Sequence, residues 1–190
     1  MRILLLILSL LGPIQDLDRA TGDALQTVRT PALEGPMNAV TRVTKPVTVL
    51  GALLLIAVVD GSGGVGTVRV ALVALAGTNL VVEGLKRLTD RTRPDGEHKS
   101  SNASFPSSHA ASAFTLAWVL GRRWKRLLPV WLVLAALVSF SRMYLHRHYL
   151  SDVVVGAAIG LFCAWAALRW LPARWIAPLR TDLPLADVVP

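Results

Sequence analysis

The chain has 190 residues, of which 53% are hydrophobic and 17% are charged, and its formal net charge at pH 7 is +8. A mean hydropathy of +0.52 indicates a membrane protein rather than a soluble one, and the length indicates a single domain. The sequence lacks a basic and aromatic surface pattern, so the positive charge favours anionic lipid head groups or phosphate substrates over nucleic acid.

The first elements in chain order are short. Residues 1–12 place an arginine before an apolar core without a small-x-small cleavage site, which predicts a short, retained membrane helix. Residues 15–33 mix apolar and charged side chains and predict one or two interfacial helices. A second membrane helix is expected at 38–59, and the glycine-rich stretch 60–66 predicts a flexible turn.

Four further apolar runs predict membrane helices at 67–85, 107–121, 127–144 and 151–171. The expected fold class is therefore all-α, an integral membrane helical bundle of about six transmembrane helices. The segment 86–106 is long and polar, and such loops are commonly functional. Prolines break the tail 173–190, which is expected to be interfacial or loosely ordered.

The order of the helices predicts which side of the membrane each loop faces. The segment 86–106 and the connection before residue 151 share one side, and the N-terminus, the 122–126 turn and the tail share the other. That second side carries many basic residues: Arg2, Arg122, Arg123, Lys125, Arg126, Arg169, Arg174 and Arg180. The positive-inside rule makes it cytoplasmic, so the polar segments are expected to face outward.

Three polar clusters converge on the outward side. They comprise Lys86, Arg91, Arg93 and Pro94; the stretch 105–109; and Ser141, Arg142, His148 and Asp152. Lysine and arginine together bind phosphate, the one as a point charge and the other through a bidentate fork. Pro106 predicts the start of a helix, where unpaired backbone N–H groups and the hydroxyls of Ser107 and Ser108 make an anion site.

Two histidines supply the remaining chemistry. His148 and Asp152 are four residues apart, so on a helical turn the carboxylate is able to accept a hydrogen bond from one imidazole nitrogen and leave the other as a nucleophile. His109 is suited to general acid–base catalysis. A metal site built from His109, His148 and Asp152 is disfavoured, because the surrounding arginines and lysine would repel a cation. The set predicts phosphoryl transfer without a metal or other cofactor.

These residues resemble the three signature motifs of the type-2 phosphatidic acid phosphatase superfamily. The motifs are Lys86-x6-Arg93-Pro94, Pro106-Ser107-Ser108-His109 and Ser141-Arg142-x5-His148-x3-Asp152, which confine the expected catalytic region to residues 86–152. The superfamily includes bacterial undecaprenyl-diphosphate and phosphatidylglycerophosphate phosphatases and the soluble vanadium haloperoxidases. The resemblance therefore implies a vanadium-haloperoxidase-like core within a single domain, residues 1–190.

The resemblance also implies a role for each motif residue. His148 would attack phosphorus and become phosphorylated, with Asp152 orienting it, and His109 would protonate the leaving oxygen and then help to activate water. The remaining motif residues would bind the phosphate: Lys86, Arg93, Arg142, Ser107, and the backbone N–H groups of Ser108 and His109. Ser108 stands where the family usually has glycine, so its role is left open.

Several neighbouring polar residues are assigned other roles. His146 lies outside the motif, and an interfacial or supporting role is favoured over catalysis. Arg91 is either an accessory phosphate ligand or a solvated loop charge, and the sequence leaves both open. Arg147 is expected to reach lipid head groups, Glu83 to pair locally with Lys86, and His98 to be solvated.

The expected function is hydrolysis of a terminal phosphate from a lipid phosphate or diphosphate, with undecaprenyl diphosphate as the favoured substrate. The expected location is a bacterial cytoplasmic membrane, with the active site on its extracytoplasmic face; the oligomeric state is left open. Phosphatidylglycerophosphate and phosphatidate are alternative substrates, and a lipid phosphotransferase would use the same phosphohistidine. The complete motifs disfavour a non-catalytic lipid-binding protein, and the membrane helices disfavour a soluble haloperoxidase.

Overall fold

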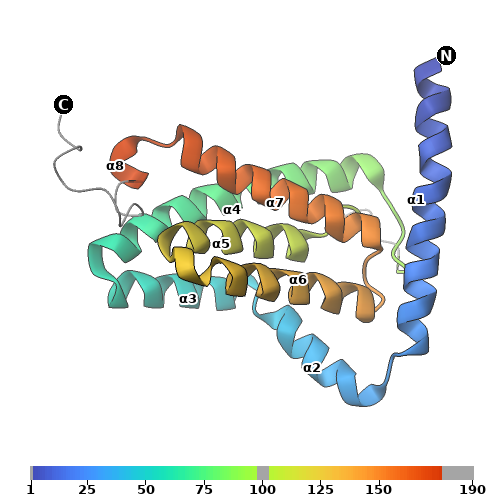
Figure 1. Cartoon of the computed structure of the whole chain (residues 1–190), viewed down its shortest axis with the longest axis horizontal. Coiled ribbons are helices and arrows are strands. Elements are labelled where there is room, and N and C mark those ends of the chain that lie inside the picture. The colour runs from blue at the N-terminus through green and yellow to red at the C-terminus, as the bar shows by residue number, and fades with distance from the viewer. Residues whose placement is uncertain (1, 98–102, 177–190) are drawn as a thin grey trace.

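The computed structural model describes residues 2–97 and 103–176, and within these ranges the chain is helical with no strand. The predicted all-α class is confirmed. The helices are α1 (Arg2–Thr27), α2 (Pro31–Arg42), α3 (Pro46–Val59), α4 (Gly61–Thr89), α5 (Ser108–Arg123), the 3-10 turn η2 (Lys125–Leu127), α6 (Leu128–Tyr144), α7 (Leu150–Trp170) and α8 (Ala173–Ile176). Figure 1 shows α3 to α7 lying along one axis as a bundle. His98 and residues 177–190 of the predicted tail lie outside the described residues.

The bundle has the character of a membrane protein. Three helical segments are long and apolar enough to cross a bilayer: Gly61–Thr89, Lys125–Tyr144 and Leu150–Trp170. The helices α2 and α3 meet the same criterion as a pair, but they are bent by 54° at the break between them. Pro46 is the first residue of α3 and has no N–H to continue the α2 ladder, which explains the break.

The helix α5 lies at the centre, where α4, α6 and α7 pack around it. It is 16 residues long and therefore shorter than the three helices that surround it. Two glycines of α7 allow the closest approach: a Cβ at Gly156 would lie 2.6 Å from the Ser107 carbonyl oxygen, and one at Gly160 would lie 2.2 Å from that of Ala111. Small residues at such crossings let helix backbones touch. This packing brings the second and third polar clusters together.

The glycine-rich stretch 60–66 was predicted as a flexible turn. The chain does turn there, at Asp60 and Gly61, whose φ is 58°, but the rest of the stretch forms the start of α4. Only Asp60 separates α3 from α4, which begins at Gly61 and continues to Thr89. A Cβ at Gly64 would lie 2.1 Å from the Ile56 carbonyl oxygen, so the glycine allows α4 to start directly against the end of α3. The Asp60 carboxylate receives two hydrogen bonds of 2.8 Å from Arg123, which tie this end of the bundle to α5.

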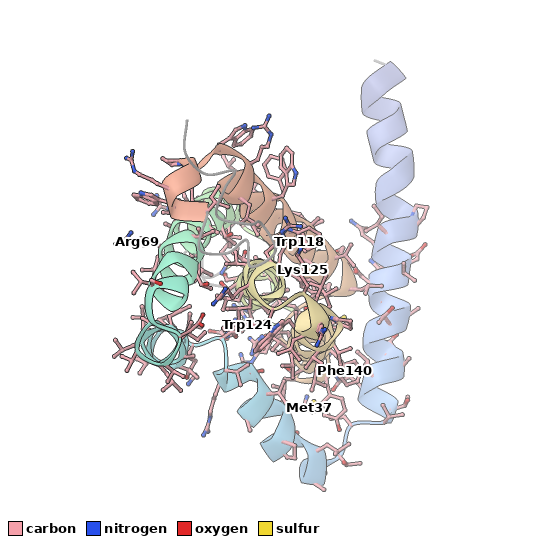
Figure 2. The ribbon with its side chains drawn as sticks, turned by 60° about the vertical axis from the view of Figure 1, so that its left-hand side comes forward. Met37, Arg69, Trp118, Trp124, Lys125 and Phe140 are labelled. Carbon is pink, nitrogen blue, oxygen red and sulfur yellow. The ribbon has the colours of Figure 1, made fainter. Side chains whose placement is uncertain are left out.

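The end of the bundle that carries η2 is basic and aromatic. Figure 2 looks toward this end and shows Trp124 and Lys125 close to it, with Arg69 projecting outward from α4. The Trp124 and Trp131 rings pack with their centroids 6.4 Å apart. Tryptophan and basic side chains gathered at one end of apolar helices are typical of a membrane–water interface.

The N-terminal region differs from the expected short membrane helix followed by separate interfacial helices. It forms one helix, α1, which contains Pro13. Figure 1 shows α1 lying crosswise to the bundle at the end opposite η2. Its inner side carries Asp18, which is buried against the start of α7 and binds the Ser151 backbone N–H at 2.8 Å. These contacts place α1 across the end of the bundle rather than alongside the other helices.

Candidate active site

Three cations are buried together at the end of the bundle that α1 covers. Lys86 comes from the last turn of α4, Arg93 from the segment between α4 and α5, and Arg142 from the last turn of α6. Their positive charges act on one another. Arg142 is only 9% exposed, and its buried Nε has no hydrogen-bond partner among the described residues. Buried like charges of this kind are costly unless an anion joins them, so the cluster suits a phosphate.

The ion pair predicted beside this cluster is confirmed. Glu83 Oε1 lies 3.8 Å from Lys86 Nζ, one turn away on α4. Glu83 is half exposed whereas Lys86 is buried, so water screens the pair and it leaves most of the lysine charge facing the site.

The N-terminus of α5 faces the same region. Ser107 is the N-cap residue: its side-chain oxygen accepts a 3.4 Å hydrogen bond from the Ala110 N–H, and its own N–H donates to the Asp152 carbonyl oxygen at 3.0 Å. Ser108 and His109 follow in the first helical turn, where backbone N–H groups have no intrahelical acceptor. The structure thus presents the helix N-terminus that the sequence predicted as an anion site.

His148 is buried in the connection between α6 and α7. Its Nδ1 lies 2.8 Å from the Ser104 carbonyl oxygen. A carbonyl only accepts hydrogen bonds, so Nδ1 carries the proton and Nε2 keeps its lone pair. Burial lowers the pKa of His148, the positive charges of Arg142 and Arg93 lower it further, and Asp152 opposes the shift. The imidazole is thereby held in the neutral form with Nε2 free.

The structure corrects the hydrogen bond expected between His148 and Asp152. The nearest carboxylate oxygen, Asp152 Oδ2, lies 3.6 Å from His148 Nδ1. This oxygen instead accepts hydrogen bonds from the Ser104 hydroxyl and from the Tyr149 N–H, the latter at 2.8 Å. The Asp152 carboxylate therefore binds the Ser104 hydroxyl, and the Ser104 backbone carbonyl in turn binds the His148 imidazole. Sequence reasoning missed Ser104 because it lies 44 residues before His148.

His109 belongs to the same site. Its half-buried side chain lies close enough to His148 and to the three cations for their charges to act on it. The structure thus gathers six of the residues predicted from the motifs into one cluster: Lys86, Arg93, His109, Arg142, His148 and Asp152. Ser107 and Ser108 stand at its edge, at the start of α5.

Arg91 is neither of the two things that the sequence left open. Its guanidinium donates to Asp152 Oδ1 at 2.7 Å and to Asp18 Oδ2 at 2.8 Å, and it stacks on the Tyr149 ring with Cζ 4.1 Å from the centroid. It is therefore engaged with protein carboxylates on both sides and is not directed at a phosphate or at bulk water.

The expectation that Arg147 reaches lipid head groups is wrong. Its Nη1 lies 2.7 Å from Asp95 Oδ2 and 2.7 Å from Glu97 Oε2. The Arg147 carbonyl oxygen accepts a 3.4 Å hydrogen bond from Arg93 Nη1. These contacts fasten the segment after α4 to the α6–α7 connection, and so help to position Arg93.

His146 lies near His148 without sharing its contacts. It has a φ of 58°, so it stands in a turn rather than on a helix. It lines a cavity of about 120 Å³ between α1 and the α6–α7 connection, together with His148, Pro94 and Asp18. Among the described residues no group of three or more His, Cys, Asp or Glu side chains is placed to hold a metal ion.

Known proteins resemble this chain in sequence. Residues 67–176 match the family model described as the PAP2 superfamily. Phosphatidylglycerophosphatase B of Bacillus subtilis is 31% identical over 170 residues, which are 78% of this chain and 80% of that protein. Decaprenylphosphoryl-5-phosphoribose phosphatase of Mycobacterium tuberculosis is 43% identical over 82 residues, covering 40% of this chain and 45% of that protein. The match to this second relative thus spans less than half of its length.

Two solved structures share the fold. The PAP2 type phosphatidylglycerolphosphate phosphatase from Bacillus subtilis superposes with a TM-score of 0.68 and 26% identity, covering 82% of this chain and 84% of that one. LpxE of Aquifex aeolicus superposes with a TM-score of 0.69 and 24% identity, covering 78% and 93%. The helical membrane architecture is therefore shared by proteins of quite different sequence.

Proposed function

Since this chain belongs to the PAP2 superfamily, we propose that it is a membrane phosphatase that releases a terminal phosphate from a lipid phosphate or diphosphate. The observation that carries the proposal is the state of His148. Its Nδ1 is occupied by the Ser104 carbonyl oxygen at 2.8 Å, which leaves Nε2 as a nucleophile beside three buried cations.

The first step forms a phosphohistidine. The Nε2 lone pair of His148 attacks phosphorus in line with the leaving oxygen, so that an N–P bond forms as the P–O bond breaks. Burial and the neighbouring positive charges disfavour the His109 imidazolium in the free enzyme, and we propose that the negative charge of the bound phosphate offsets them. His109 then donates a proton to the leaving oxygen. Lys86, Arg93 and Arg142 surround the equatorial oxygens of the transferring group. The N–H groups at the start of α5 add donors, because charge in this transition state is spread over those oxygens.

The second step regenerates the enzyme. Water attacks phosphorus as the N–P bond breaks, and His109, deprotonated by the first step, takes the proton from that water. Inorganic phosphate leaves, and the neutral His148 returns with its proton still on Nδ1. The fixed cations supply the charge stabilisation that a divalent ion supplies in other phosphoryl-transfer enzymes, so we propose that no metal takes part.

An apolar cavity supports a lipid substrate. It has a volume of about 410 Å³, within the usual range for ligand sites, and lies between the α2–α3 pair and the helices α5 and α6. Ala113 and Ala117, which line it, follow His109 at four and eight residues on the same face of α5, and Val138 lies four residues before Arg142 on α6. The helix faces that carry the phosphate site thus continue as the wall of the cavity, where a hydrocarbon chain fits.

The candidate substrates are of two kinds, polyprenyl carrier lipids and phospholipids. We favour undecaprenyl diphosphate, hydrolysed at the extracytoplasmic face of a bacterial cytoplasmic membrane. The basic residues at the end of the bundle opposite the site support this orientation, and they include Arg69, Arg122, Arg123, Lys125, Arg126, Arg169 and Arg174. Arg2, which was predicted on the same side, belongs to α1 at the other end of the bundle. The similarity to phosphatidylglycerophosphatase B over most of both chains supports phosphatidylglycerophosphate as the alternative.

The test is phosphate release from purified protein in detergent micelles, measured on undecaprenyl diphosphate, phosphatidylglycerophosphate and phosphatidate in the presence of a chelator. Release without an added hydroxyl acceptor distinguishes a hydrolase from a phosphotransferase. We expect the highest kcat/KM on undecaprenyl diphosphate. If no phosphate is released from any of the three lipids, the proposed activity is contradicted.

The cavity is tested by a matched pair of variants on α3. Ala52→Phe adds a ring inside the cavity, whereas Leu55→Phe places one on the exposed side of the same helix. We expect Ala52→Phe to raise KM for long-chain lipid phosphates but not for a short-chain, water-soluble phosphate monoester, and Leu55→Phe to change neither. Equal effects of the two variants would exclude the cavity as the site of the hydrocarbon chain.

A further inference from the structure

Asp18 of α1 is a buried carboxylate outside the three motifs. It is 2% exposed, although α1 is otherwise solvent-facing on this stretch and Asp16, two residues earlier, has a side chain that is 77% exposed. A buried carboxylate is costly unless its oxygens are fully hydrogen-bonded. Asp18 meets this requirement through Ser151, whose N–H donates to Oδ1 at 2.8 Å and whose hydroxyl donates to Oδ2 at 2.6 Å, and through Arg91.

Arg91 connects this carboxylate to the catalytic cluster. One amino group, Nη2, donates to Asp18 Oδ2 at 2.8 Å, and the other, Nη1, donates to Asp152 Oδ1 at 2.7 Å. The guanidinium is held flat between them by stacking on the Tyr149 ring. One cation thus bridges two buried carboxylates, of which one belongs to α1 and the other to the site.

The connection ends at the nucleophile. Asp152 uses its second oxygen, Oδ2, for the Ser104 hydroxyl and the Tyr149 N–H, and Ser104 accepts the Nδ1 proton of His148 through its carbonyl oxygen. Without the negative charge at position 18, Asp152 would be the only carboxylate bound to Arg91, and the arginine would neutralise more of its charge. Asp152 would then offset less of the positive charge around the imidazole.

We propose that Asp18 is a positioning residue of this active site, acting through Arg91 and Asp152 on the orientation and charge environment of His148. The proposal rests on the function proposed above. It makes α1 part of the active site, although no residue of the three motifs lies on this helix. The hydrogen bonds of Asp18 go to Ser151 and Arg91 and not to His148 or the three buried cations, so we expect its effect on the rate of phosphohistidine formation rather than on binding.

The experiment compares Asp18→Asn with Asp18→Glu and with Asp16→Asn as the exposed control, all as the full chain in micelles. For Asp18→Asn we expect kcat to fall roughly 10-fold or more with KM little changed, in the range seen when groups that orient a catalytic ligand are removed. Asp18→Glu keeps the charge and should recover part of the rate, and Asp16→Asn should match the wild type.

A second readout separates positioning from mere docking of α1. Removing a negative charge disfavours the imidazolium, so the pKa of His148 should fall further in Asp18→Asn. The acidic limb of kcat/KM should therefore move to lower pH. The same shift should appear in an NMR titration of the His148 ring, assigned by its loss in His148→Ala. This titration needs no turnover, so it tests the positioning role even if the assayed lipids are not hydrolysed.

Two results would overturn the proposal. The first is an unchanged His148 titration in Asp18→Asn, with thermal unfolding equal to that of the wild type. The second is a lower unfolding temperature with the pH profile unmoved, because that result would assign Asp18 to the attachment of α1 alone. A wild type without phosphatase activity but with the expected NMR shift would refute the proposed function and leave the connection standing.

Discussion

His148 and Ser104 are joined by a side chain to backbone contact: the imidazole Nδ1 lies 2.8 Å from the Ser104 carbonyl oxygen, nearer than the 3.6 Å to Asp152 Oδ2. The tautomer of the proposed nucleophile is therefore set by a peptide group, which no side-chain substitution removes. The Asp152 carboxylate acts on His148 indirectly, through its hydrogen bond with the Ser104 hydroxyl and through its negative charge. This division of roles leads to different expectations for the two side chains.

His148→Ala is expected to abolish phosphate release, with kcat lowered by about 1,000-fold or more, because no other group can form the covalent intermediate. Folding should be largely retained, as judged by thermal unfolding in micelles. His146→Ala is the matched control, since its side chain lies two residues away, outside the proposed phosphate cluster, and it should retain most activity. Near wild-type turnover in His148→Ala would refute the phosphohistidine.

Asp152→Asn is expected to be milder than His148→Ala. Where a carboxylate alone sets the tautomer, as in the serine protease triad, the corresponding change lowers kcat by about 10,000-fold. Here Ser104 keeps Nδ1 protonated, so we expect a loss of about 10- to 100-fold in kcat. Steady-state kinetics on one lipid phosphate measures the ratio. A loss as large as that of His148→Ala would mean that Asp152, not Ser104, controls the imidazole.

The pH dependence of kcat/KM should carry the signature of a buried imidazole. Burial lowers the pKa of His148, and the charges of Arg142 and Arg93 lower it further against the opposing effect of Asp152. Attack on phosphorus needs the neutral form, so a lowered pKa keeps the enzyme active as the pH falls through about 6.5, the ordinary value for histidine. The acidic limb assigned to His148 should lie below that value. An acidic limb above about 6.5 would contradict the lowered pKa of His148.

Gly160→Ala is expected to disturb the site from a distance. Its Cβ would lie 2.2 Å from the Ala111 carbonyl oxygen, so α7 and α5 would have to separate. We expect a destabilisation of about 1 to 3 kcal/mol together with a lower kcat, because α5 carries His109 and α7 carries Asp152. Gly77→Ala on α4 is the control, since nothing lies within 4 Å of its added Cβ. Thermal unfolding and turnover of the two variants decide the outcome.

Chelation should leave activity intact. The buried charges of Lys86, Arg93 and Arg142 supply the stabilisation otherwise provided by a divalent ion, so protein treated with EDTA and assayed without added metal should retain its full kcat. Restoration of activity only by a specific divalent ion would refute the metal-free mechanism.

Much of the site was predictable from sequence because its residue types are rare in apolar surroundings. Lysine, arginine, histidine and aspartate at the ends of membrane helices are costly unless they share a task, so residue type and spacing indicated the three polar clusters. The resemblance to the family motifs then selected six residues from these clusters: Lys86, Arg93, His109, Arg142, His148 and Asp152. The helix boundaries were predicted less well. Glycine was taken to end a helix at 60–66, whereas Gly64 permits close packing of α4 against α3.

The contacts around the motifs were not predictable. Arg147 was expected at the lipid surface, yet it forms ion pairs with Asp95 and Glu97. A long charged side chain can reach several partners, and only the folded loop determines which of them lie within reach. Arg91 likewise found two carboxylates, one of them 73 residues earlier in the chain. Such pairings join segments that are remote in sequence, and spacing along one helix carries no information about them.

The sequence by itself determined the class of the protein, a helical membrane bundle, and the chemistry of its polar clusters, because hydropathy and residue type are local properties. Only the tertiary structure decided that a carbonyl of Ser104 sets the state of His148, and that Asp18 on α1 reaches the site through Arg91. The physical reason is that hydrogen bonds require donor and acceptor within about 3 Å. Which groups come that close is fixed by helix packing, here by the approach of α7 to α5 at Gly156 and Gly160.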